Sequence, residues 1–127
     1  MVEANELYGR PTVQLGGIIT DQSGLSRTVM RTAKDISGSG DTELVAAQTG
    51  LRIRLLALSY QSALAVSIRF KSAGNNLSAL YTLAINGQLV WPYNPHGWPE
   101  TGVGEALNVN QSGAIASAAQ IVWTAAP

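Results

Sequence analysis

The fold is decided by residues 64–71, which read LAVSIRFK. Large apolar side chains occupy every second position, and the residues between them are small, polar or basic. A strand with one face on a core and the other in water has this period of two. The stretch therefore predicts a half-buried β-strand.

The preceding residues, 51–60 (LRIRLLALSY), begin with the same alternation and then lose it. After Leu55, the apolar residues Leu56, Leu58 and Tyr60 fall on the side that arginine held. Either a bulge near Leu55 shifts the phase of the strand, or the strand is covered on both faces. A helix over residues 51–70 is excluded, because the later alternation is clean, β-branched and aromatic residues are frequent and no helix cap is present.

A third alternating stretch, residues 77–85, is followed directly by Asn86-Gly87 and then by residues 88–91. Asn-Gly between two such runs predicts a hairpin, because both residues tolerate the positive φ of a type I′ turn. Further strands are expected near residues 26–36, 42–48, 105–111 and 115–124, separated by Gly-rich turns. About eight strands without crossover helices predict an antiparallel β-sandwich, with the jelly roll favoured over an immunoglobulin-like or other Greek-key sandwich.

Residues 1–25 have no sustained period and are interrupted repeatedly by glycine and proline. They are expected to form an extended N-terminal arm ahead of a sandwich domain over residues 26–127. The arm is more apolar than a solvated tail requires, which favours docking on a neighbouring chain over a disordered tail. The residues expected to make this contact are Val13, Leu15, Ile18 and Ile19.

The composition suits one domain that buries much of its surface against partners. Apolar residues make up 46% of the 127-residue chain and charged residues 13%, whereas roughly 25% charged is usual. Eight basic and eight acidic residues cancel, which argues against nucleic acid as a partner. No apolar run approaches the ~18 residues that cross a bilayer, and acidic residues occupy the N-terminus, so neither a membrane span nor a signal peptide is expected. Every Lys and Arg lies at or before Lys71, which fits either two differently used surfaces or a chance distribution of solvated charges.

Residues that carry catalysis or bind metals are scarce. The chain has no Cys, and His96 is its only histidine, so thiolate sites and paired-histidine metal sites are excluded. Asp35, Asp41 and Glu43 offer oxygen ligands for calcium but match no EF-hand loop, and a solvated turn is favoured. No glycine-rich phosphate loop is present. We therefore expect no catalytic residue, no metal, no cofactor and no small-molecule substrate, and hence no enzyme.

Residues 91–98 (WPYNPHGW) concentrate aromatic and proline residues in one loop. Rigid aromatic side chains such as Trp91, Tyr93 and Trp98, with His96 beside them, suit an interface anchor or stacking on a sugar ring. The alternative is that the tryptophans only cap one end of the sandwich.

Several stretches carry a resemblance to a known family. GLRIRLL (50–56), VSIRFKS (66–72), WPYNPHGW (91–98) and GEALN (104–108) resemble small β-rich virion proteins of tailed bacteriophages, nearest to jelly-roll head decoration, or cement, proteins. The resemblance covers residues 50–123. It implies a homotrimer, made in the host cytoplasm, that sits on the outer capsid surface of the virion and bridges neighbouring major capsid protein subunits.

This resemblance also gives the candidate surfaces their roles. If strand 51–60 is apolar on both faces because one face meets another copy, Leu56, Leu58 and Tyr60 form the trimer interface. The arm then contacts the capsid or another subunit, and no catalytic residue is carried over. The alternative function is a receptor- or glycan-binding β-sandwich module of a phage tail or fibre, with the aromatic loop as its site.

Overall fold

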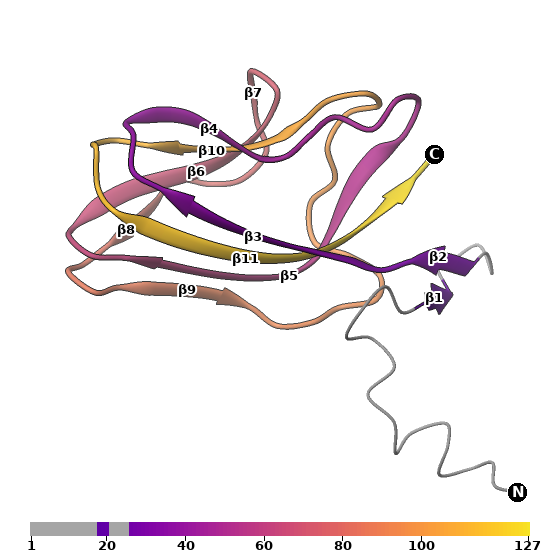
Figure 1. The fold of residues 1–127 in the computed structure, drawn as a ribbon, viewed down its shortest axis with the longest axis horizontal. Helices are drawn as coiled ribbons and strands as arrows, with labels where there is room; N and C mark the ends of the chain where they lie inside the picture. The colour runs from indigo at the N-terminus through magenta and orange to yellow at the C-terminus, as the bar shows by residue number, and fades with distance from the viewer. Residues whose placement is uncertain (1–17, 21–25) are drawn as a thin grey trace, which may run out of the picture.

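The protein is an antiparallel β-sandwich in a computed structural model that describes residues 18–20 and 26–127 (Figure 1). The strands are β1 (Ile18–Thr20), β2 (Ser26–Thr28), β3 (Met30–Ile36), β4 (Gly40–Val45), β5 (Arg52–Ser62), β6 (Val66–Ser72), β7 (Asn75–Asn76), β8 (Tyr81–Leu83), β9 (Gln88–Trp91), β10 (Leu107–Gln111) and β11 (Ser117–Ala126). The prediction of an all-β antiparallel sandwich is confirmed in these residues. No helix in this range is long and apolar enough to cross a membrane.

Two sheets form the layers of the sandwich. The first has four strands in the order β3-β11-β5-β9. The second has five, in the order β4-β10-β6-β7, with β8 also paired to β6. β7 pairs with the end of β6 and β8 with its beginning, so the two share one edge of that strand's sheet. β1 and β2 form a separate two-stranded ladder.

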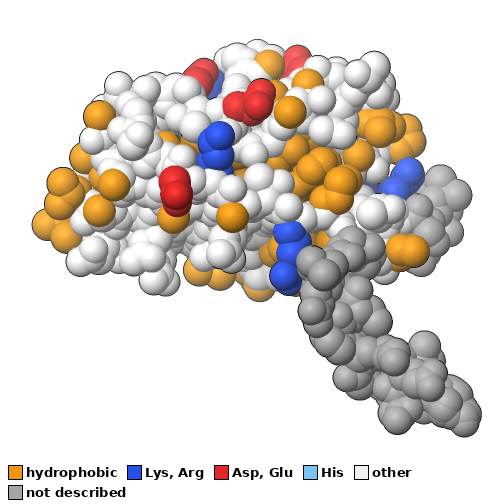
Figure 2. Space-filling model, viewed as in Figure 1, with side chains coloured by type: hydrophobic (Ala, Val, Ile, Leu, Met, Phe, Trp, Pro, Cys, Tyr) orange, Lys and Arg blue, Asp and Glu red, His pale blue; other side chains and the backbone are white. Residues whose placement is uncertain are grey.

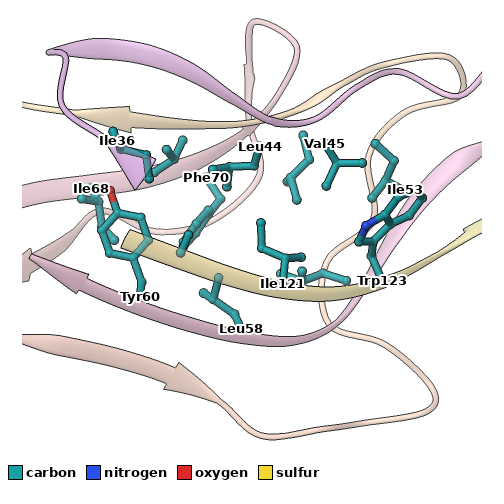
Figure 3. Packing of buried hydrophobic residues seen from close by; sticks show 14 of the residues in the cluster. Ile36, Leu44, Val45, Ile53, Leu58, Tyr60, Ile68, Phe70, Ile121 and Trp123 are labelled. Atoms are coloured by element: carbon teal, nitrogen blue, oxygen red, sulfur yellow. The ribbon is translucent and has the colours of Figure 1, made fainter. Parts of the chain in front are cut away.

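The core lies between the two sheets and draws side chains from both (Figure 3). Val66, Ile68 and Phe70 of β6 are buried and alternate with half-buried polar residues, which confirms the predicted half-buried strand. Leu64 departs from the pattern with 53% of its surface exposed, because it lies in the turn before β6 begins.

The loss of alternation in residues 51–60 is explained by a β-bulge. Val122 of β11 faces Ala57, but the next residue, Trp123, faces Leu55, so Leu56 has no partner in the ladder. The extra residue shifts the phase of β5, and the apolar residues on either side of the bulge face the same core. Leu56 instead belongs to a small separate cluster with Val29 and Val122. Of the two explanations for the lost alternation, a bulge and a strand covered on both faces, the structure shows the bulge.

The predicted hairpin at Asn86-Gly87 is wrong. β8 pairs with β6 and β9 pairs with β5, so this turn carries the chain from one sheet to the other. Asn86 does adopt a positive φ of 57°. Gly87 is required for a close approach, since a Cβ there would lie 2.8 Å from the carbonyl oxygen of Ala84. The expected type I′ turn is also not formed, because Gly87 does not share the positive φ of Asn86, and the two flanking strands find their apolar partners in different layers.

Candidate functional site

The outer faces of the two sheets differ in charge, and charged side chains are sparse on the side of the molecule seen in Figure 2. On the sheet that contains β4, β10 and β6, the outer face holds Asp41, Glu43, Arg69 and Lys71. Asp41 accepts a hydrogen bond of 2.7 Å from the Asn110 side chain and lies 3.8 Å from the Lys71 ammonium. This face is polar, and Asp41 is paired within it, as expected for a surface in water.

The opposite outer face is charged at its edge strand β3, which carries Arg31 and Asp35, but small and uncharged across the neighbouring parts of β11, β5 and β9. Neither residues 57–61 of β5 nor residues 118–122 of β11 include a charged residue. Ser59 lies at the centre of this face, directly between Gln120 of β11 and Val90 of β9. We call this surface the small-residue face; its outward side chains are Ala57, Ser59, Gln61, Gln88, Val90, Ala118, Gln120 and Val122. A surface without charges loses little hydration free energy when another protein covers it.

The residues predicted to form a trimer interface lie inside the single chain. Leu58 is 2% exposed and Tyr60 is fully buried, and both face the core between the sheets (Figure 3). Leu56 is also fully buried, in the cluster with Val29 and Val122. The assignment is corrected because the bulge, and not a neighbouring subunit, accounts for their apolar character. These side chains have no surface left for a second copy.

A buried polar network lies next to Tyr60 and was not found from the sequence. The Tyr60 hydroxyl and the Ser117 hydroxyl each donate a 2.6 Å hydrogen bond to Oε1 of Gln111, which is 1% exposed. Burial raises the pKa of Tyr60, against a smaller lowering by the hydrogen bond with Ser117. Gln111 ends a strand with buried residues at every second position, and a polar residue in that phase is the signal that identifies it.

The aromatic loop is a stack that runs outward from the core. Trp91 lies 5.3 Å from the ring of Phe70 and 6.2 Å from that of Tyr81, measured between centroids. Trp98 stacks on Trp91 at 5.7 Å with an interplanar angle of 30° and donates its indole N–H to the carbonyl oxygen of Pro92. Trp91 therefore closes one side of the core, as the capping alternative has it, while Trp98 remains 38% exposed.

The loop is held against the first half of β5. The amide of Asn94 donates to the carbonyl oxygen of Leu56, and the amide of Trp98 donates to that of Leu55. Gly97 has a φ of 90°, and a Cβ there would lie 2.5 Å from Cγ of Arg54. These contacts fix the position of Trp98.

Other predicted contacts lie apart from this stack or outside the described residues. Tyr93 is 46% exposed and His96 is exposed, and the His96 amide donates to the Asn94 side chain. In the arm, Ile18 is 67% exposed and belongs to β1. Val13 and Leu15 lie outside the described residues, as does the side chain of Ile19.

The acidic residues do not gather into a metal site in the part of the chain that the structure describes, where no three of His, Cys, Asp and Glu come together. Glu100 pairs with Arg54, and Glu105 accepts a hydrogen bond from the Ser72 hydroxyl.

Comparisons with known proteins assign no family. No family model matches the sequence, and no curated protein matches it. Among solved structures, the capsular polysaccharide assembling protein CapF from Staphylococcus aureus is similar at 15% identity with a TM-score of 0.26. The match covers 84% of this chain and only 29% of CapF.

Proposed function

We propose that this chain is a structural virion protein that trimerises on the outer surface of a capsid and bridges neighbouring major capsid protein subunits. The observation that carries the proposal is the small-residue face, a patch of uncharged side chains that lies between the charged edge strand β3 and the edge strand β9. The resemblance of residues 50–123 to head decoration proteins of tailed phages supports the same function. A protein that binds only the assembled shell stabilises that shell by mass action, without any chemistry.

The strand pairing supports the jelly-roll form of the sandwich. β3 pairs with β11, β4 with β10, β5 with β9, and β6 with β8. The first strand of the sandwich thus pairs with the last, the second with the second-last, and so on inward along the chain. The same pairing results when a long antiparallel ribbon is rolled into two sheets. Jelly rolls are built from eight strands in two such sheets and are common in viral capsid proteins.

The small-residue face takes the place of the buried residues as the proposed trimer contact. Its side chains lose little conformational entropy on burial, and none brings an unpaired charge into the contact. The arm, with Val13, Leu15, Ile18 and Ile19, is the proposed strap to the capsid or to another subunit. The described part of the arm, Ile18–Thr20, pairs with β2, which directly precedes β3 of this sheet.

Ser59→Arg should separate the trimer without unfolding the chain. The new guanidinium at the centre of the face would be buried without a partner, so we expect the dissociation constant to rise at least about 100-fold. Sedimentation should then show a mass near the 13.3 kDa of one chain in place of three. Binding to expanded capsids that lack this protein, measured by co-sedimentation, should weaken in parallel.

Thr82→Arg is the matched control, since Thr82 is exposed on the other sheet. It should leave both the mass and capsid binding unchanged. If the unmodified chain sediments as one subunit at micromolar concentration, or if both variants bind capsids equally well, the proposed contact is wrong.

A second candidate, a receptor- or glycan-binding module of a tail or fibre, is favoured by Trp98. Its indole is fixed by stacking and by the hydrogen bond to Pro92, yet it remains partly exposed. If this ring stacks on a sugar, Trp98→Ala should weaken binding of a bacterial surface oligosaccharide about tenfold. Titration followed by tryptophan fluorescence measures this, and an unaltered affinity in the variant rejects the candidate.

A further inference from the structure

Strand β3 (Met30–Ile36) is the outermost strand of the four-stranded sheet. It pairs along one side with β11 and with no other strand of the described residues. A hollow lined by Arg31, Ala33 and Val122, among others, lies on its paired side, where β3 meets β11. An unpaired edge offers a row of backbone donors and acceptors to another strand.

Charged side chains usually protect such an edge, but Arg31 and Asp35 of β3 are self-complementary, while Lys34 points to the other face and lies opposite Thr32 when the pairing is centred on Ala33. Arg31, Ala33 and Asp35 are exposed and point to the outer face. Neither Arg31 nor Asp35 forms an ion pair with a described residue. Reversing the strand exchanges the positions of the two charges about Ala33.

Two copies of β3 can pair antiparallel in several two-fold registers, and the charged side chains favour one of them. In an antiparallel pair, two residues that lie opposite each other point to the same face of the sheet. The two-fold axis must therefore pass beside a residue that lies opposite the same residue of the other copy. Centring on Arg31, Lys34 or Asp35 places like charges directly opposite each other, which is destabilising. Centring on Thr32 pairs no charges. Centring on Ala33 places Arg31 of each copy opposite Asp35 of the other.

We infer that β3 is a two-fold contact at which two copies of this chain pair edge to edge, antiparallel and centred on Ala33. The axis runs perpendicular to the sheet, so both small-residue faces lie on the same side of one continuous sheet. The contact is distinct from the proposed trimer and stands without it. Where trimers do form, it would join neighbouring trimers.

Reciprocal charge changes test the register. Arg31→Asp and Asp35→Arg each place like charges opposite each other twice in the pair, so either should raise the dissociation constant at least about tenfold. The double variant Arg31→Asp/Asp35→Arg should restore association. Glu43→Arg, an equal charge change at an exposed position of β4, is the control and should have no effect. Sedimentation over a concentration series measures all four; if the double variant fails to recover, the register is wrong.

Disulfide formation through one introduced cysteine tests the contact directly, because the natural chain contains no cysteine. Ala33→Cys would place the two thiols opposite each other, within the Cα separation of about 4.4–6.8 Å that a disulfide spans. Mild oxidation of the full chain should give linked pairs on a denaturing gel, with or without Ser59→Arg. Thr82→Cys, exposed on the other sheet, should remain unlinked. Equal linking of both variants, or none in Ala33→Cys, overturns the proposal, as does protection at high dilution of the β3 amides that point away from β11.

Discussion

Leu58→Asp should unfold the domain, and not merely separate its subunits. Leu58 is 2% exposed and faces the core, with Ile121 of β11 as its partner in the ladder. The change removes a packed side chain and leaves a carboxylate in the core without a partner. Together these effects cost about 5 kcal/mol or more, comparable to the whole stability of many domains. Circular dichroism and urea unfolding should detect the loss.

Ser59→Asp is the control for this experiment, because the neighbouring residue points to the opposite face of the same strand and is exposed. That variant should keep the native spectrum, because Ser59 is on the surface of the single chain, and its midpoint of unfolding should match that of Ser59→Arg, which also separates the trimer. A folded, monomeric Leu58→Asp protein would instead return this side chain to an interface between subunits.

The strands that the sequence predicts best are those with one buried face and one solvent-exposed face. In β6, large apolar side chains alternate with Ser67, Arg69 and Lys71, and the pattern alone fixes both the strand and its orientation. Residues 77–80 are the opposite case, although they continue an apolar alternation. The amides of Leu77 and Ser78 both donate to the carbonyl oxygen of Phe70, so this segment turns back and only Tyr81–Leu83 joins the sheet.

Long-range pairing could not be obtained from local patterns. At β5, a bulge and a covered second face give the same sequence signature, and only the pairing of Leu55 with Trp123 distinguishes them. The mistaken trimer interface follows from that ambiguity. The turn at Asn86 is a similar case, because the sequence identifies a turn but not the sheet to which the next strand adds.

One of the two candidate surfaces could be predicted from the sequence and the other could not. The aromatic loop was predicted because tryptophan and proline are conspicuous, and the structure does bring Trp91 and Trp98 together. The small-residue face was missed because Ala, Ser and Gln carry almost no signal individually. Only the register that places Ser59 between Gln120 and Val90 reveals a continuous uncharged surface.

Gln111 holds one end of the sandwich together through both ends of its amide. Its oxygen accepts hydrogen bonds from the Tyr60 and Ser117 hydroxyls. Its nitrogen donates to the carbonyl oxygens of Gly38, at 3.1 Å, and Ile115, at 3.0 Å. One side chain thus links the core to the loop before β4 and the loop before β11.

Gln111→Ala should therefore destabilise the domain by about 3 kcal/mol or more, the sum of a small cavity and buried hydroxyls left without an acceptor. Urea unfolding measures the loss, and Gln120→Ala, an exposed glutamine on β11, should show almost none. Tyr60→Phe tests the network itself, because it removes one of the two hydroxyls that Gln111→Ala would leave without an acceptor. It should cost stability in the unmodified chain and little or nothing when added to Gln111→Ala. Additive losses in the double variant would mean that the two side chains stabilise the fold separately, and that the network is not the reason Gln111 is buried.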